Sequence, residues 1–110
     1  MLNKYYKQGD GAPALQLRVL SSVTRRPLDF TGCTVFFNMT RINPDGTETA
    51  VIENGVGSQS DGVLSYSWGE SDLDVTGEYI GVFTVFYNEG AGPPKSYPTK
   101  GVIRIFVESL

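Results

Sequence analysis

The chain has 110 residues, of which 40% are hydrophobic and 12% aromatic, and its formal net charge is −3. This length fits one domain built on one hydrophobic core. The nine basic residues are scattered, with only Arg25 and Arg26 adjacent, so the sequence lacks the basic stripe of a nucleic-acid-binding protein. It contains no histidine and a single cysteine, Cys33, which excludes Ser-His-Asp and Cys-His catalysis, an internal disulfide and a cysteine-based zinc site.

Two further absences concern membranes and export. The sequence has no run of about 18 apolar residues that could span a bilayer. Residues 1–10 lack the apolar segment of a signal peptide. We therefore expect a protein that is made in a cytoplasm and does not insert into a membrane.

Residues 1–12 are polar and contain the pair Tyr5-Tyr6. We interpret them as an N-terminal arm or loop rather than a strand, followed by a single β-sandwich domain over residues 13–110. The arm is either a disordered terminus or a strap that contacts a neighbouring subunit. The tyrosine pair supports the strap, because Tyr is enriched at interfaces.

The first strands follow from period-2 alternation of apolar and polar residues. Residues 14–19 predict a half-buried strand whose core face carries Leu15, Leu17 and Val19. Residues 33–40 predict a second strand with its odd positions facing the core. The turn sequence Asn43-Pro44-Asp45-Gly46 connects it to a weaker, edge-like strand over residues 47–52.

The middle of the chain starts with a segment rich in Gly, Ser and Asn over residues 53–61, which we interpret as a loop. Residues 63–68 then predict a strand with Leu64, Tyr66 and Trp68 on one face. Residues 69–74 make at most one helical turn.

The longest strand-like run covers residues 79–87 and is apolar on both faces. The preceding Gly77-Glu78-Tyr79 is typical of the corner of Greek-key sandwiches, where a tyrosine hydrogen-bonds back to the loop before its strand. Residues 88–94 form a turn and residues 95–100 a bridging segment. The last strand, over residues 102–107, directs Ile103, Ile105 and Val107 inward. Six or seven short strands at intervals of roughly ten residues indicate a sandwich or barrel.

Several motifs follow one another in a family-like order over residues 12–108. They are the strand at 15–19, Leu28-Asp29-Phe30-Thr31-Gly32-Cys33-Thr34-Val35, Gly62-Val63-Leu64-Ser65-Tyr66, Gly77-Glu78-Tyr79, and Tyr97-Pro98 ahead of Ile103-Arg104-Ile105. In this order they resemble the N-terminal domain of the baseplate upper proteins of tailed phages, in which Leu is common at the position of Phe30.

The resemblance implies an immunoglobulin-like antiparallel β-sandwich of six to eight short strands. It also implies a non-enzymatic structural protein of a phage or prophage, located in the virion as a baseplate, tail or neck component. Its partners would be other virion proteins and further copies of the chain in a homo-oligomer. In the family this domain usually begins a longer chain, whereas this sequence ends at Leu110; other virion roles, such as a head accessory protein, therefore stay open.

Aromatic residues supply the candidate contact sites. Phe36, Phe86 and Phe106 fall on the faces opposite the core phases of their strands, and two of them side by side would form an exposed apolar patch, which usually marks an interface. The candidate interface residues are Tyr5, Tyr6, Phe36 and Phe106. The alternative function is a non-catalytic module that binds a glycan or a host surface through Tyr66, Trp68 or Tyr97, although the spacing of Tyr66 and Trp68 also fits a sandwich core.

Two chemical alternatives concern thiols and cations. Cys33 lies on the core-facing phase of its strand, which favours a buried, inert thiol. Asp72, Asp74 and Glu78, with Glu70 nearby, are loop-forming residues, ligands of a calcium ion or an acid/base pair. Because Asp72-Leu73-Asp74 lacks the regular run of oxygen ligands of a calcium loop, we expect no metal site, no cofactor and no catalytic residues.

Overall fold

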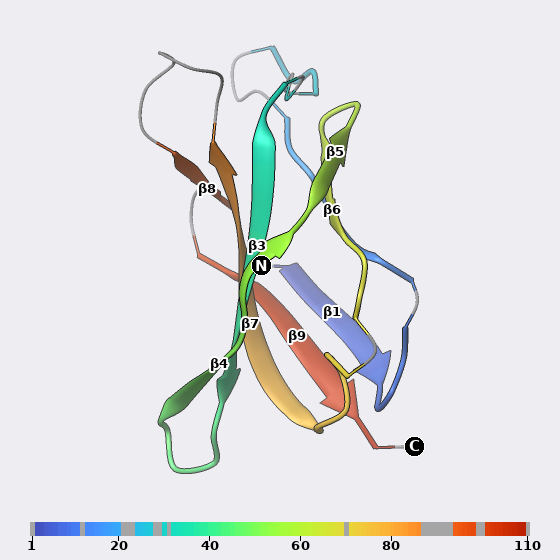
Figure 1. Cartoon of the computed structure of the whole chain (residues 1–110), viewed down its shortest axis with the longest axis vertical. Helices are drawn as coiled ribbons and strands as arrows, with labels where there is room; N and C mark the ends of the chain where they lie inside the picture. The colour runs from blue at the N-terminus through green and yellow to red at the C-terminus, as the bar shows by residue number, and fades with distance from the viewer. Residues whose placement is uncertain are drawn as a thin grey trace.

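The computed structural model describes residues 2–11, 13–20, 24–27, 30, 32–69, 71–86, 94–98 and 101–109. These residues contain nine strands: β1 (Leu2–Lys7), β2 (Leu15–Arg18), β3 (Thr34–Ile42), β4 (Glu48–Val56), β5 (Ser58–Ser60), β6 (Val63–Tyr66), β7 (Gly77–Phe86), β8 (Lys95–Tyr97) and β9 (Ile103–Glu108). The strands form a six-stranded and a three-stranded sheet. Figure 1 shows β5 and β6 at the side of the larger sheet. In the ranges given above, no helix is present that could cross a membrane.

The strand order identifies the architecture. The larger sheet has the order β1-β9-β7-β3-β4, with β8 also paired to β7, and the smaller has the order β2-β6-β5. These orders match the G-F-C-C′ and B-E-D strands of a variable-type immunoglobulin domain. The chain is therefore an immunoglobulin-like β-sandwich, as predicted. Among the described strands, β1 and β9 form the only parallel pair.

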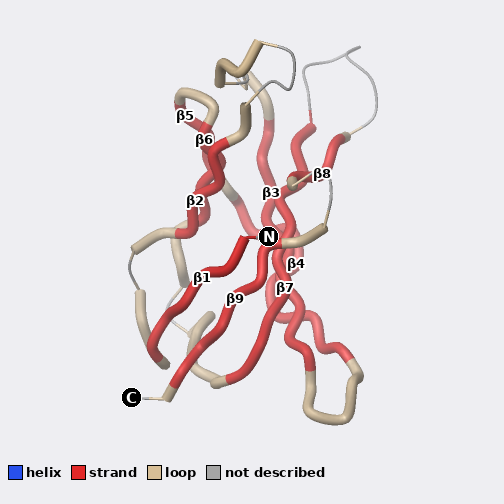
Figure 2. The backbone as a smooth tube through the Cα atoms, turned by 180° about the vertical axis from the view of Figure 1, so that it is seen from behind, coloured by secondary structure: helices blue, strands red, loops and turns tan. Residues whose placement is uncertain are grey.

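Strand β7 lies at the centre of the larger sheet. One edge pairs with β3 over residues 78–86, and the other edge is divided between β9 at residues 77–81 and β8 at residues 83–85 (Figure 2). Its predicted two-faced character is confirmed, because Tyr79, Phe83 and Val85 are buried while Ile80 and Val82 are half-buried on the other side. Tyr87, the last residue of the predicted run, lies outside the described residues.

The core between the sheets is centred on Phe37 of β3. Its ring lies 4.9 Å from Tyr66, 4.9 Å from Phe83 and 6.1 Å from Trp68, between ring centroids. The ring also lies over the backbone of Gly81, where an added Cβ would come within 2.7 Å of Phe37 Cζ. Glycine is needed here for close approach rather than for a turn. The predicted inward positions Leu15, Leu17, Leu64, Ile103, Ile105 and Val107 are all buried.

The structure of the N-terminal segment differs from the predicted arm or loop. Residues 2–7 are not an arm or loop but strand β1, which pairs in parallel with β9 from Leu2 beside Ile103 to Lys7 beside Glu108. The hydrogen-bonding partner is about 100 residues away in the sequence, so the local pattern could not reveal it. Met1 and Ala12 of the predicted arm lie outside the described residues.

Two segments predicted as connections are also strands. The predicted loop over residues 53–61 is wrong, because β4 continues to Val56 and β5 begins at Ser58. Between them Gly57 carries the chain from one sheet to the other, and its N–H donates to the Val35 carbonyl oxygen at 2.9 Å. Residues 95–97 of the predicted bridging segment form β8 against β7. In both cases the strand is defined by backbone pairing with a neighbouring strand. The polar side chains of these segments do not indicate that pairing.

Candidate functional site

The candidate site is the outer face of the larger sheet, which is turned away from the smaller one. Alternation along β7 directs Ile80, Val82 and Phe86 to this face, opposite the buried residues. Phe86 is 44% exposed, and Ile80 and Val82 are half-buried. A sheet that is buried on one face normally presents polar residues on the other, so this apolar run needs an explanation.

Two aromatic pairs lie on the same face. Tyr5 of β1 stacks on Phe106 of β9 with ring centroids 5.1 Å apart and an interplanar angle of 15°. Phe36 of β3 meets Phe86 of β7 edge to face at 5.6 Å. Tyr5 is 63% exposed. The structure thus places Phe36, Phe86 and Phe106 opposite the core and brings Phe36 and Phe86 side by side, as the sequence pattern indicated.

The register of the strands sets the spacing of the two pairs. Tyr5, Phe106 and Glu78 are neighbours in one row across β1, β9 and β7. Phe36 is beside Thr84, six residues farther along β7, which corresponds to about 20 Å. Ile80 and Val82 connect the two ends. We call the surface formed by Tyr5, Phe36, Ile80, Val82, Phe86 and Phe106 the aromatic face.

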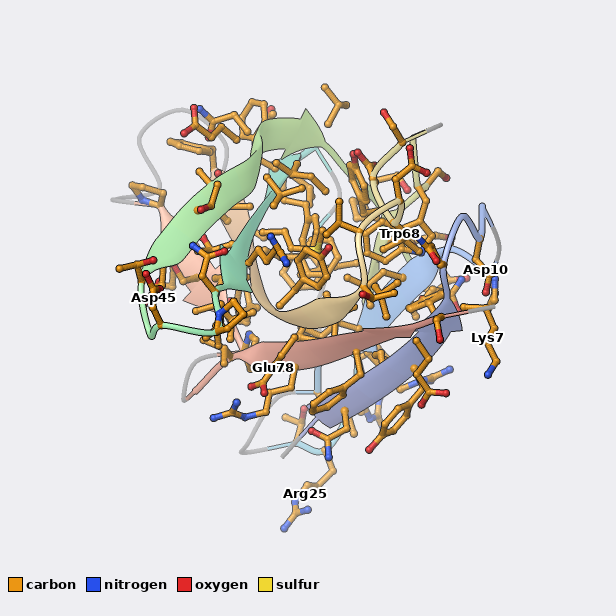
Figure 3. The ribbon with its side chains drawn as sticks, turned by 90° about the horizontal axis from the view of Figure 1, so that it is seen from below. Lys7, Asp10, Arg25, Asp45, Trp68 and Glu78 are labelled. Carbon is orange, nitrogen blue, oxygen red and sulfur yellow. The ribbon has the colours of Figure 1, made fainter. Side chains whose placement is uncertain are left out.

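One ion pair interrupts this surface. The Arg104 guanidinium of β9 contacts the Glu78 carboxylate of β7, and both side chains are about one-third exposed. Figure 3 shows Glu78 on the opposite side of the β9 ribbon from Trp68, which lies toward the core. Partly exposed pairs of this kind contribute little to stability but fix how a complementary surface can dock.

Tyr6 is not part of this surface, contrary to the prediction. Its side chain is 7% exposed and lies edge-on to Trp68 with ring centroids 5.2 Å apart. Adjacent residues of a strand point to opposite faces, so Tyr5 and Tyr6 cannot share one. Burial raises the pKa of the Tyr6 phenol above its usual value. The tyrosine pair therefore splits into one surface and one core residue.

The three aromatic residues of the candidate glycan platform lie in the core or pack against it. Trp68 is 8% exposed and its Nε1–H donates to the Pro13 carbonyl oxygen at 3.2 Å. Tyr97 is 5% exposed and meets Phe30 edge to face at 5.6 Å. Tyr66 is half-buried against Phe37. Trp68 and Tyr97 therefore lack the exposed ring on which a sugar could stack.

The acidic residues Asp72 and Glu78 have different partners and do not form one site. Asp72 Oδ2 accepts hydrogen bonds from Tyr66 Oη at 2.9 Å and from the Gly69 N–H at 2.6 Å, whereas Glu78 contacts Arg104 on the outer face. Glu70 lies outside the described residues. In the described part of the chain, no three His, Cys, Asp or Glu side chains gather closely enough to hold a metal ion. Cys33 is half-buried and packs against the core.

No protein-family model and no curated protein sequence matches this chain.

Proposed function

We propose that the chain is a non-enzymatic structural protein of the virion of a tailed phage or prophage, in the baseplate, tail or neck. It assembles with other copies of itself and with other virion proteins through the aromatic face. The observation that carries this proposal is the presence of two aromatic pairs on one sheet face, the exposed Tyr5 with the half-buried Phe106 and the half-buried Phe36 with the exposed Phe86. The order of the sequence motifs supports the assignment to a virion.

The physical basis is burial of apolar surface between two sheet faces. Aromatic side chains are enriched in interfaces and supply most of their binding energy. Two sheets pack well when their strand directions differ by about 30°, and the aromatic face belongs to a twisted sheet of this kind. The Arg104–Glu78 pair beside the Tyr5–Phe106 end of this face would be polar enough to select one docking orientation.

This function needs no cofactor, metal ion or catalytic residue. A symmetric assembly reuses the same surface on every copy, so a small domain can contribute a large total contact area. The alternative is a module that binds a glycan or a host surface. It is less favoured, because the rings of Trp68 and Tyr97 are buried.

The test is absolute molar mass by light scattering over a range of concentrations, up to about millimolar, where weak contacts become populated. We expect the wild type to form a discrete oligomer. The double variants Phe36→Ser/Phe86→Ser and Tyr5→Ser/Phe106→Ser should be monomeric with circular-dichroism spectra like the wild type. The control is Leu20→Ser, which replaces an apolar residue that is 46% exposed and lies outside the aromatic face.

Two results would contradict the proposal. Assembly of both double variants at wild-type concentrations would exclude the aromatic face as the contact surface. Absence of the chain from purified particles of the phage or prophage that encodes it, measured by quantitative mass spectrometry, would exclude the role in the virion.

A further inference from the structure

A second candidate surface lies at the edge of the smaller sheet. Strand β2 pairs with β6 alone among the described strands, which makes it an edge strand. The Val19 N–H donates to the Gly62 carbonyl oxygen at 2.9 Å. In an antiparallel pair, hydrogen-bonded residues alternate with residues whose peptide groups point away. Leu17 and Leu15 therefore bond to β6, and Gln16 and Arg18 direct their N–H and C=O groups to the open edge.

A shallow groove of about 350 Å³ follows this edge. It is lined by Lys4 of β1, by Gln16, Leu17 and Arg18 of β2, and by Val63 of β6. Three consecutive residues of β2 line it, so the groove runs along the backbone of the strand rather than over one side chain. A neighbouring hollow shares Gln16, Arg18 and Val63 with it.

The groove carries two positive charges. The ion pairs found among the described residues are those of Lys7 with Glu108 and Arg104 with Glu78, so neither Lys4 nor Arg18 has an ionic partner there. One carboxylate, that of Asp61, lines the neighbouring hollow. This is a local basic site on a chain whose net charge is −3, and it favours a negatively charged occupant.

We propose that the groove binds a short extended segment of a partner protein, with alternating acidic and apolar residues, which adds to β2 as a fourth strand of the smaller sheet. Strand addition uses main-chain hydrogen bonds for affinity and alternate side chains for specificity. The free peptide groups of Gln16 and Arg18 would supply the hydrogen bonds. Acidic side chains would lie beside Arg18, and apolar ones would contact Leu17 below the Lys4 ammonium group.

The dimensions limit the segment. Strand β2 has four residues, about 13 Å of extended chain, so the bound segment has four or five residues. A small anion would satisfy the two charges but would leave the outward peptide groups unused. The site shares β1 with the aromatic face but uses its other side, because the adjacent residues Lys4 and Tyr5 point to opposite faces of that strand.

The test is a two-dimensional ¹⁵N–¹H NMR titration of the protein with the end-blocked peptide Gly-Glu-Val-Glu-Val-Glu-Gly. We expect saturable shift changes that concentrate on the amides of Gln16, Arg18 and Lys4. The matched probe is the same peptide with all its backbone nitrogens methylated, which keeps the charge but removes the donors. It should bind at least about tenfold more weakly.

Two protein variants separate hydrogen bonding from charge. Gln16→Pro removes an outward N–H and leaves the ladder to β6 intact, which an edge strand tolerates. Arg18→Glu reverses one charge, and Lys95→Glu on β8 is its control. We expect each of the first two to weaken peptide binding at least about tenfold, while Lys95→Glu and Phe36→Ser/Phe86→Ser bind as the wild type does.

Three outcomes would overturn the proposal: no saturable shifts, shifts centred away from β2, or equal binding of the methylated peptide, which would indicate an anion site only. If Gln16→Pro does not fold, the methylated peptide and Arg18→Glu still decide the matter. None of these outcomes depends on whether the aromatic face assembles.

Discussion

The phenol of Tyr66 donates a hydrogen bond to Asp72 Oδ2 at 2.9 Å, and the same oxygen accepts the Gly69 N–H at 2.6 Å. One carboxylate thus joins the end of β6 to the turn that leads into β7. Because Tyr66 also packs on Phe37 at 4.9 Å, this turn is fixed to the centre of the core. Asp72 therefore has a structural role in this turn, which corresponds to the loop-forming interpretation of the sequence.

Replacing Asp72 should destabilise the fold, whereas replacing its neighbour should not. Asp72→Ala leaves the Tyr66 hydroxyl and the Gly69 N–H without their acceptor, which we expect to cost about 1–2 kcal/mol of unfolding free energy. Asp74 is exposed, so Asp74→Ala should change it by less than about 0.5 kcal/mol. Urea denaturation measures both, and equal losses would contradict the role assigned to Asp72.

The free energy of unfolding should decrease in alkaline solution because the Tyr66 phenol loses its proton. Burial, together with the hydrogen bond to Asp72 and the charge of Asp72, raises the pKa of Tyr66 from 10.0 to about 12. The unfolded chain then loses this proton at lower pH than the folded chain, so the contribution is complete below pH 10 and is lost as pH rises toward 12.

Denaturation midpoints measured across this pH range should decline less steeply for Tyr66→Phe than for the wild type. The decline should persist in part, because burial also raises the pKa values of Tyr6 and Tyr79. An identical pH profile for the variant and the wild type would exclude Tyr66 as a source of the alkaline loss.

The close approach of Phe37 to β7 should make Gly81 intolerant of a side chain. In Gly81→Ala the new Cβ would lie 2.7 Å from Phe37 Cζ and 2.8 Å from Phe37 Cε1. We expect a loss of about 1–3 kcal/mol by overpacking, measured by thermal and chemical unfolding. Gly11→Ala is the control, since nothing lies within 4 Å of its added Cβ.

A second substitution tests the cause of that loss. In Gly81→Ala/Phe37→Leu the ring is absent, so the two changes should be less damaging together than the sum of the single effects. Strict additivity would mean that Phe37 is not what excludes a side chain at Gly81.

The corner before β7 should contribute a measurable hydrogen bond. The Tyr79 hydroxyl donates to the Val75 carbonyl oxygen, as the Gly77-Glu78-Tyr79 sequence predicted. Tyr79→Phe removes the donor and keeps the ring, which we expect to cost about 1 kcal/mol. The comparison is Tyr5→Phe on the surface, which should be nearly neutral, and a neutral Tyr79→Phe would show that the corner does not stabilise the fold.

The parts of the fold that the sequence predicted are those in which side chains decide the structure. Strands β2, β3, β7 and β9 alternate or are apolar on both faces, and the buried positions followed from the period alone. The turn at residues 43–46 was also predictable, because Gly46 adopts a positive φ of 91° there. Local chemistry and long-range packing agree at these positions.

The sequence pattern missed the strands that exist because of backbone pairing with another strand. Strand β1 exists through its pairing with β9, and β5 consists of Ser58, Gln59 and Ser60, residues that are common in loops. The positions of candidate site residues followed the same division. Phe36 and Phe106 were placed correctly by alternation, but Tyr6 required knowledge that its segment is a strand. The groove beside β2 was missed because Lys4 belongs to that same segment.

The pairing of β1 with β9 has a consequence for the chain as it is being made. The six residues of β1 are synthesised before their hydrogen-bonding partner, which emerges about 100 residues later. Until then β1 lacks the strand with which it pairs in the folded protein. Because closing so long a loop is slow, the larger sheet gains its final strand only after the ribosome has delivered β9. In the growing chain, β1 is therefore among the last strands to pair within the larger sheet.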